Sequence, residues 1–197
     1  MRKVRAYIGL GANLGDASAT LAAGIRALAG LPGVRLRGVS RLYATTPVGN
    51  VEQPEFRNAV VALDVPAGPD PATGATSLLV ELKQIERASG RQERERWGPR
   101  ELDLDLLLFG RASLALDRPP KGQSLDRGKA DHLLVVPHPE AAERLFVLAP
   151  LSDLAPGLAP PGWGEIVASA RRRRAAAEGL HAVRPIARWN GEGWAAF

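Results

Sequence analysis

The chain has 197 residues, 45% hydrophobic and 24% charged, which is typical of one globular domain with a substantial core. It has no cysteine, which excludes thiolate catalysis, disulfide bonds and cysteine-based zinc sites. The formal net charge of +5 comes mainly from arginine, whose guanidinium group binds phosphate well. The sequence contains no run of about 18 apolar residues, so it predicts no membrane-spanning helix. We therefore expect a cytoplasmic protein with no membrane partner.

The first half of the chain is expected to alternate strands and helices. Residues 4–10 predict a strand, and the glycine-rich residues 9–16 predict a loop whose Asp16 caps the next helix. Hydrophobic spacing and turn residues define the elements that follow. They are a helix over residues 17–29, a strand over 34–43 interrupted near Gly38, a loop over 44–55, a strand over 56–65 and a helix over 71–89.

The second half adds more strands than helices. Its expected elements are a charged loop over residues 91–100, strands over 102–109 and 112–116, an exposed insertion over 117–131, a strand over 133–136, helices over 139–148 and 165–178, and an edge strand over 181–189. We expect one domain over residues 1–189 and an irregular tail over 190–197. Several consecutive strands have no helix between them, which favours an α+β fold with antiparallel pairs over a doubly wound parallel sheet.

Two aspartates stand out in the strand that begins at Leu102. Because strand side chains alternate, Leu102, Leu104, Leu106 and Leu108 share one face, whereas Asp103 and Asp105 share the other. Two carboxylates roughly 5 Å apart repel by about 3 kcal/mol at an effective dielectric near 20. A solvated strand face or pairing with arginines would relieve this repulsion, and so would a bound metal ion.

The loop before this strand favours the metal. It supplies four arginines, Arg91, Arg94, Arg96 and Arg100. Carboxylates prefer hard magnesium ions, which bring phosphate oxygens with them, and arginines neutralise the phosphate charge that the metal does not reach. Together these groups are typical of phosphoryl transfer, and two carboxylates can hold a pair of metal ions.

Two other patterns are weaker indications of function. Gly9-x-Gly11-x-x-x-Gly15 is similar to a dinucleotide-binding turn, but its third glycine comes one residue late and the expected acidic residue is missing. The run Arg171-Arg172-Arg173-Arg174 could bind nucleic acid. On a helix, however, four consecutive residues fan around the axis, so we expect a solvated face and no nucleic-acid partner.

Residues 96–105, Arg-Trp-Gly-Pro-Arg-Glu-Leu-Asp-Leu-Asp, with Phe109-Gly110 beyond, resemble the 6-hydroxymethyl-7,8-dihydropterin pyrophosphokinases of folate biosynthesis. Over residues 4–160 the other motifs of that family appear in order. They are Gly11-x-Asn13-x-Gly15, the segment 43–49, Gln53-Pro54-Glu55-Phe56-Arg57-Asn58 and Val136-Pro137-His138-Pro139. The resemblance implies a ferredoxin-like α/β/α sandwich with a mainly antiparallel sheet.

The resemblance also implies an activity and a set of site residues. The family transfers the terminal diphosphate of ATP to the hydroxymethyl oxygen of the pterin and releases AMP. By resemblance, Asp103 and Asp105 would coordinate two magnesium ions, and Arg91 and Arg100 would contact the phosphates and stabilise the transferring group. The ATP side would be lined by Glu86, Arg96, His138 and Arg144, with Trp97 beside them.

The pterin pocket follows from the same resemblance. Trp97 and Phe146 would stack on the two faces of the pterin, and Asn58 would offer both a donor and an acceptor to its edge. Thr45 and the backbone near Val48 would complete the pocket, and Phe56 lies where the family usually has an aromatic residue. Taken alone, these aromatic residues could be core residues and His138 a helix cap.

The chain departs from the family on the nucleotide side. The second arginine of the loop after Gly90 is replaced by Glu93, with Arg94 one residue later, and Leu133 and Pro139 replace an arginine and an aromatic residue. The insertion is longer than the family turn, and the end from about Asn190 extends past the usual terminus. These changes suggest altered ATP affinity rather than a different reaction.

Two alternative functions remain open at the level of sequence. Another magnesium-dependent phosphotransferase or nucleotidyltransferase would explain Asp103 and Asp105, but not Trp97, Asn58 and Phe146. A ferredoxin-like RNA-binding module would suit the net charge, but it usually exposes aromatic residues where this sheet carries two aspartates. The leading hypothesis is a monomeric pterin pyrophosphokinase that uses ATP and magnesium.

Overall fold

The computed structural model describes residues 2–46, 53–90, 100–118 and 132–197. Most of its strands form one sheet in the order β5-β1-β4-β3-β8-β9, with β2 also paired to β4, and all of its pairs are antiparallel. The sheet consists of β1 (Lys3–Ala12), β2 (Arg35–Val39), β3 (Leu42–Thr45), β4 (Phe56–Pro66), β5 (Asp103–Phe109), β8 (Val183–Trp189) and β9 (Trp194–Ala196). β6 (Leu114–Asp117) and β7 (His132–Val136) form a second, two-stranded sheet.

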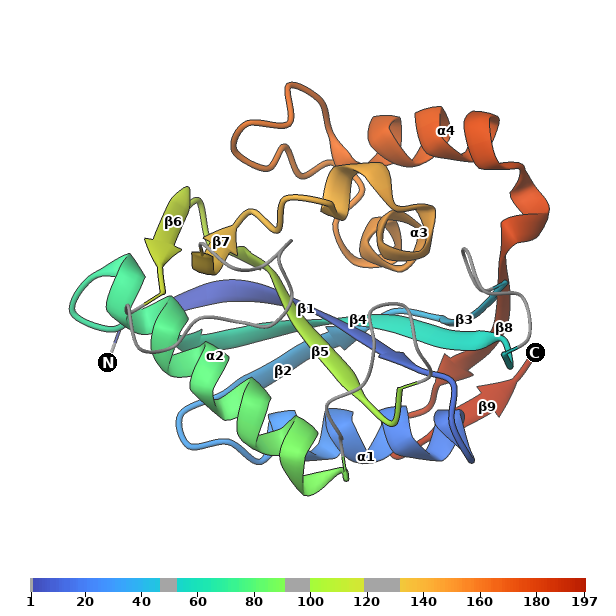
Figure 1. Ribbon diagram of the computed structural model, residues 1–197, viewed down its shortest axis with the longest axis horizontal. Coiled ribbons are helices and arrows are strands. Elements are labelled where there is room, and N and C mark those ends of the chain that lie inside the picture. The colour runs from blue at the N-terminus through green and yellow to red at the C-terminus, as the bar shows by residue number, and fades with distance from the viewer. Residues whose placement is uncertain (1, 47–52, 91–99, 119–131) are drawn as a thin grey trace.

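Helices cover both faces of the large sheet (Figure 1). The helices α1 (Ala17–Ala29) and α2 (Pro71–Ala88) pack on one face around a core that includes Ile8, Leu63 and Leu104. On the other face lie α3 (Leu145–Leu154) and α4 (Val167–Glu178), over a smaller core that includes Val60 and Leu107. The expected α+β sandwich with a mainly antiparallel sheet is therefore confirmed.

The amino-terminal strand is longer than the sequence predicted. β1 continues to Ala12 and pairs with β4 and β5, so that Gly9 and Gly11 lie inside a strand and not in a loop. This placement also rules out the dinucleotide-binding turn, which needs its glycines between a strand and a helix. Asp16 caps α1 as predicted, because its side chain accepts a hydrogen bond from the Ala19 amide at 3.0 Å.

One prediction about the face of β5 is wrong. Leu104 and Leu106 lie in the core beneath α1 and α2, as expected, but Leu108 packs with Leu107 in the opposite core. The register between β1 and β5 shifts between Tyr7 and Ile8, where β5 carries one extra residue. A β-bulge of this kind turns the following side chains to the other face, which simple alternation cannot foresee.

The predicted strand over residues 34–43 is in fact two strands. β2 and β3 pair with different stretches of β4 and are separated at Ser40 and Arg41. Ser40 closes this break, because its hydroxyl accepts a hydrogen bond from the Val60 amide at 2.9 Å. β3 then extends to Thr45, whereas the loop was predicted to begin at Ala44.

The predicted helix over residues 139–148 is also divided. Pro139 lies in a turn, the short 3-10 helix η2 (Ala141–Glu143) follows, and Arg144 is extended with φ −117°. The helix α3 then begins at Leu145 and continues through Pro150. The sequence predicts that this helix ends near Leu148, whereas Pro150 lies inside α3. The proline removes one intrahelical hydrogen bond, and the burial of Leu148, Ala149 and Leu151 offsets that cost.

The carboxyl-terminal residues were predicted as an edge strand and an irregular tail. After the 3-10 helix η3 (Leu180–Ala182), β8 pairs with β3, and β9 pairs with β8 on its other side. β9 is therefore the edge, and residues 190–197 contain a strand. The predicted insertion over residues 117–131 lies outside the described residues, except for Asp117 and Arg118. No helix among the described residues is long and apolar enough to cross a membrane.

Candidate active site

Three neighbouring strands align polar groups in one row across the sheet. Gly11 of β1 lies opposite Asp103 of β5 on one side and Asn58 of β4 on the other, and Gly9 lies opposite Asp105. Directly paired residues point to the same face, and adjacent strands lie about 4.8 Å apart, so Asp103 and Asn58 are separated by about 10 Å. The two glycines carry no side chain into this interval, and a Cβ on Gly9 would contact the Leu107 side chain at 3.4 Å.

Asn58 and Thr45 form one polar unit in this row. The Asn58 amide donates a hydrogen bond to the Thr45 hydroxyl at 2.7 Å, and both residues are buried. A Cβ on Gly11 would lie 3.1 Å from Asn58 Oδ1, so a glycine there keeps the amide oxygen accessible. Phe56 is paired with Thr45 and shares its face. The structure thus brings together Thr45, Phe56 and Asn58, three of the residues predicted to bind the pterin.

Arg100 and Asp103 form an ion pair at the start of β5. Asp103 is mostly buried, with 17% of its side chain exposed, and Arg100 is 30% exposed. The guanidinium therefore lies next to a carboxylate of the predicted metal pair and near the sheet face. That Arg100 and the two aspartates act on the same group remains a prediction.

The donor set at Asp103 and Asp105 fits magnesium bound together with a phosphate. Within the described ranges no cluster of three or more histidine, aspartate or glutamate side chains could hold a metal ion. Magnesium commonly takes one or two carboxylates and completes its octahedron with substrate phosphates and water. A pair of carboxylates on an open strand face therefore suits a metal that arrives with ATP, but not a closed metal site made by the protein alone.

Asn13 is a connection that the sequence reasoning missed. The side chain is 2% exposed, and its Oδ1 accepts a hydrogen bond from the Arg100 amide at 2.8 Å. Its Nδ2 donates to Gln53 Oε1 at 3.0 Å and to the Pro54 carbonyl at 3.2 Å. One buried amide thus joins the segment before β5 to the segment before β4. The only sequence signal was its place in the Gly-x-Asn-x-Gly motif, which gave no role.

Arg144, Phe146 and His138 lie along the segment that leads into α3. The Arg144 guanidinium lies 5.6 Å from the centre of the Phe146 ring and pairs with Glu140. The His138 amide donates to the Leu107 carbonyl of β5 at 2.9 Å, which anchors this segment beside the strand that carries the aspartates. His138 Nδ1 also accepts a hydrogen bond from the Glu140 amide at 3.3 Å, which supports the alternative reading of a local cap.

Glu86 has a different environment from the one expected for a nucleotide contact. It is 2% exposed on α2, and its carboxylate accepts a hydrogen bond from the Leu104 amide at 2.7 Å. Lys83 Nζ lies 2.8 Å and 2.9 Å from its two oxygens. The carboxylate is therefore directed at the backbone of β5.

Four predicted site residues lie outside the described residues: Val48, Arg91, Arg96 and Trp97. Glu93 and Arg94, at which the chain departs from the family pattern, lie there as well. The assignments made for these residues remain predictions.

A buried network holds β3 against α3 beside the site. Asp153 accepts hydrogen bonds from the Tyr43 hydroxyl at 3.0 Å and from Arg41 Nη2 at 2.5 Å. Burial, together with the neighbouring Asp153 carboxylate, raises the pKa of Tyr43 well above its ordinary value. Tyr43 therefore stays protonated and acts as a hydrogen-bond donor that fixes α3 over the sheet.

Two arginines of the run on α4, Arg173 and Arg174, are engaged with acidic side chains. Arg173 donates to both oxygens of Glu143 at 2.9 Å and 3.1 Å and to Glu165 at 3.0 Å. Arg174 donates to Glu143 and to Glu178. The run thus ties α4 to η2, directly before Arg144 and Phe146.

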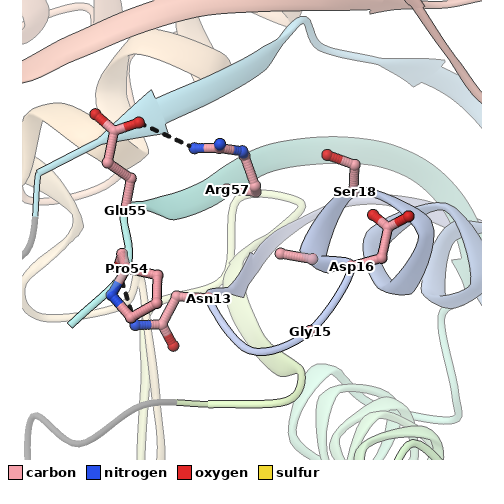
Figure 2. A pocket seen from close by; sticks show the side chains of 8 residues that line it. Asn13, Gly15, Asp16, Ser18, Pro54, Glu55 and Arg57 are labelled. Atoms are coloured by element: carbon pink, nitrogen blue, oxygen red, sulfur yellow. Dashed lines mark hydrogen bonds and ion pairs between the residues drawn. The ribbon is translucent and has the colours of Figure 1, made fainter.

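A small polar pocket opens at the amino-terminus of α1 (Figure 2). Arg57, which pairs with Glu55 at 3.3 Å, alternates with Asn58 along β4 and so points to the opposite face of the sheet. The pocket is therefore distinct from the row of Asp103, Gly11 and Asn58. Its lining residues are Asn13, Gly15, Asp16, Ala17, Ser18, Pro54, Glu55 and Arg57.

Comparisons with a family model and with three similar proteins all point to pyrophosphokinases of a hydroxymethyl-dihydropterin. A family model described as 7,8-dihydro-6-hydroxymethylpterin-pyrophosphokinase matches residues 7–156. The chain is 42% identical over 157 residues to the 2-amino-4-hydroxy-6-hydroxymethyldihydropteridine pyrophosphokinase of Pseudomonas aeruginosa, covering 80% of this chain and 84% of that protein. The proteins of the same description from Methylorubrum extorquens and Bacillus subtilis are 40% identical over 154 residues and 38% identical over 149 residues. These two alignments cover 78% and 76% of this chain, and 84% and 77% of the relatives.

A solved structure is similar in fold. A crystal structure of the HPPK-DHPS of Plasmodium falciparum superposes with a TM-score of 0.73 at 14% identity, covering 100% of this chain and 49% of that one. At this identity the likeness concerns the fold alone, and the chain spans about half the length of that protein.

Proposed function

The chain belongs to the 7,8-dihydro-6-hydroxymethylpterin-pyrophosphokinase family, and from this membership we infer how its described residues share the reaction. It is a diphosphokinase of folate biosynthesis that takes the terminal diphosphate of ATP to the hydroxymethyl group of 6-hydroxymethyl-7,8-dihydropterin and releases AMP. The proposed roles of single residues rest on the row of Asp103, Gly11 and Asn58. In this row a carboxylate and an amide side chain lie on the same face of the sheet, with a glycine between them.

The bonds that change define what the site must hold. The hydroxymethyl oxygen attacks the β-phosphorus of ATP, the bond from that phosphorus to the oxygen bridging the α-phosphorus breaks, and AMP leaves. The hydroxyl proton is released during the transfer. Charge therefore accumulates on phosphate oxygens between the pterin and the nucleotide, which is where preorganised cations stabilise a loose transition state.

On the phosphate side, we assign Asp103 and Asp105 as ligands of two magnesium ions that bind with ATP. Magnesium would neutralise phosphate charge and orient the transferring group when bound. Arg100 places a positive charge beside Asp103, with which it forms an ion pair. Its backbone amide is held in place by a hydrogen bond to Asn13. His138 and Arg144 approach from the segment beside β5 and would contact the nucleotide. Arg91 and Arg96 keep the phosphate and nucleotide roles that the resemblance implies.

On the pterin side, the Asn58–Thr45 pair would recognise the edge of the heterocycle. The Asn58 side chain has an NH₂ donor and a carbonyl acceptor. Its hydrogen bond to Thr45 fixes which of the two would face the ligand. Phe146 would stack on the ring from the start of α3, where Arg144 already lies over it. Trp97, Val48 and Phe56 complete the proposed pocket.

We further propose a monomer without a nucleic-acid partner. Arg173 and Arg174 are engaged with acidic side chains of their own chain, which supports the absence of a nucleic-acid partner. Sedimentation of the purified protein would test the monomer, and a stable dimer would contradict it. Since ATP is the phosphate donor, we propose the cytoplasm, where this nucleotide is abundant, as the location.

The test of the metal assignment is a charge-removing variant. We expect Asp105→Asn to lower kcat for AMP release by at least about 1000-fold, because phosphate charge is then left without its cation. AMP formation should depend on both magnesium and the hydroxymethyl pterin in the wild type. Glu81→Gln removes a carboxylate from the partly exposed part of α2 and serves as the matched control. Turnover by Asp105→Asn at the wild-type rate with magnesium would refute the metal role.

A further inference from the structure

Glu86 is a buried carboxylate that the reaction chemistry leaves unexplained. Among the residues that the structure describes, it is the one acidic side chain in the fully buried class, at 2% exposure. Its contacts include the Leu104 amide and the Lys83 ammonium group, at distances between 2.7 Å and 2.9 Å. Removing a carboxylate from water costs free energy, and hydrogen bonds and an opposite charge offset that cost. Leu104 and Lys83 supply both to Glu86.

The position of Leu104 in β5 indicates what its hydrogen bond to Glu86 does. β5 is the terminal strand of the sheet on this side and pairs on its other edge with β1. Amide groups along such an open edge need partners from outside the sheet. Glu86 supplies that partner at the one residue that lies between Asp103 and Asp105.

We propose that Glu86 is a positioning residue, which holds the Leu104 peptide so that Asp103 and Asp105 are presented to metal-bound ATP. This proposal rests on the metal assignment made above. The carboxylate fixes the backbone from the edge of the strand, whereas the aspartate side chains project from its face. Lys83 offsets the buried charge and keeps the carboxylate oriented, since its ammonium group reaches both oxygens.

This role differs from contact with ATP. A side chain that contacts ATP directly would need an oxygen directed at the nucleotide, yet one Glu86 oxygen accepts from both Leu104 and Lys83, and the other accepts from Lys83. The effect of Glu86 on the nucleotide should therefore pass through the aspartates. Partners that orient metal ligands typically change metal affinity by about 10-fold to 100-fold when they are removed.

Two variants of similar size separate the possibilities. Glu86→Gln keeps an oxygen acceptor for the Leu104 amide, whereas Glu86→Met keeps the volume and removes the acceptor. We expect Leu104 amide exchange, measured by NMR without ligands, to accelerate at least tenfold in Glu86→Met and to remain within about threefold of wild type in Glu86→Gln. Glu81→Gln and Glu81→Met are the matched controls on the same helix.

Metal binding supplies the second measurement. Mn²⁺, followed by electron paramagnetic resonance in the presence of a non-hydrolysable ATP analogue, should bind about 10-fold to 100-fold more weakly to Glu86→Met and within about threefold of wild type to Glu86→Gln. If Glu86→Met does not fold, Glu86→Gln decides alone. Retained Mn²⁺ affinity then supports the positioning role, and weak Mn²⁺ binding with a protected Leu104 amide overturns it.

Other outcomes separate this inference from the function on which it rests. Lower affinity for the ATP analogue without metal, together with unchanged Leu104 exchange and Mn²⁺ affinity, would show a direct nucleotide contact and overturn the positioning role. Equal losses of Mn²⁺ affinity in Glu86→Gln and Glu86→Met would also overturn it, because the acceptor would then be irrelevant. If wild type and Asp105→Asn bind Mn²⁺ equally, the metal assignment itself is wrong.

Discussion

At the scale of single residues, one buried amide connects the two halves of the proposed site. Asn13 uses both amide protons and its carbonyl oxygen to hold Arg100, Gln53 and Pro54, and it is almost completely buried. Arg100 belongs to the phosphate side of the proposed site, whereas Pro54 lies two residues before Phe56 on the pterin side. Asn13 thus sets the distance between the two halves.

Substitution of Asn13 should separate these two connections. Asn13→Ala removes both and should lower kcat/KM by at least about tenfold and the free energy of unfolding by about 1–3 kcal/mol, because buried partners lose their hydrogen bonds. Asn13→Asp keeps an acceptor for the Arg100 amide but loses the donor to Pro54, so it should raise the pterin KM more than it lowers kcat. Steady-state kinetics and urea unfolding would measure both effects. Wild-type constants in Asn13→Ala would contradict the connecting role.

The sequence could predict a residue's chemistry more readily than its partner. Alternation was sufficient to place Asp103 and Asp105 on one face, and the motif was sufficient to associate Thr45 with Asn58. Glu86 shows the limit, because its sequence position is compatible with either a nucleotide contact or a backbone contact. Only the approach of α2 to the edge of β5 distinguishes them, and that approach depends on packing over the whole core.

At the scale of elements, α4 braces the segment that carries Arg144 and Phe146. Arg173 forms a two-pronged contact with Glu143 of η2 and donates to the Ala142 carbonyl at 3.2 Å as well. The sequence predicted a solvated arginine face. The Arg173 side chain is partly exposed, as predicted, but it is also paired with Glu143. Its partner Glu143 lies far away in sequence, and a helical wheel cannot identify such a partner.

The brace should depend on pH. The hydrogen bond from Arg173 lowers the pKa of Glu143 below its ordinary value. A carboxylate with a lowered folded pKa contributes stability that is complete above its unfolded pKa, about 4.3, and is lost as the pH falls through the folded value. Arg173→Met should therefore lower the Tm by ~1–3 °C at pH 7 and by less at pH 3, a small effect because the pair is exposed.

Thermal unfolding of a neighbouring variant provides the control for this brace. Arg172→Met loses only a hydrogen bond to the Ser169 hydroxyl, at 3.0 Å, and should leave the Tm unchanged at both pH values. An equal loss of stability in Arg173→Met at pH 7 and pH 3 would show that packing, and not the ionised Glu143, is responsible.

Element boundaries were predicted well where a local signal marks them. Asp16 and Asp70 cap their helices through side-chain hydrogen bonds to Ala19 and Thr73, so the starts of α1 and α2 were predictable. The bulge in β5 was not, because Leu104 to Leu108 is a nearly continuous apolar run in which either face is acceptable at each position. Extended Arg144 is similar, since no local residue forbids a continuous helix there.

At the scale of the whole molecule, the chemistry and the carboxyl-terminal strands occupy opposite ends of the sheet. The sheet begins with β5, which carries the aspartates, and ends with β9 (Figure 1). The overall α+β class could be predicted because strands without intervening helices pair antiparallel. The added strand β9 could not, since the apolar run Trp194 to Phe197 is only four residues long and follows two glycines, too short a pattern to predict a strand.

The β8–β9 hairpin is held by one aromatic contact between its own strands and by two hydrogen bonds to α1. The Trp189 and Trp194 rings meet edge to face at 5.1 Å, Trp194 Nε1 donates to the Ser18 carbonyl at 3.0 Å, and Arg26 donates to the Glu192 carbonyl at 2.8 Å. An aromatic pair contributes about 1 kcal/mol beyond its area and a hydrogen bond about 1 kcal/mol. The hairpin should therefore stabilise the fold at the end of the sheet remote from Asp103.

Removal of residues 190–197 tests this separation of stability from chemistry. The truncated chain should lose about 2–3 kcal/mol in the free energy of unfolding, because the three contacts disappear together and the outer edge of β8 loses its partner. Its kcat should stay within about twofold of wild type, since β3, β4 and β1 still separate β8 from β5. Phe197→Ala, at a side chain that is 70% exposed, is the control and should change neither quantity. A large fall in kcat at temperatures where the truncated chain is fully folded would mean that the far edge of the sheet contributes to the active site, and that the two ends are coupled through β3 and Thr45.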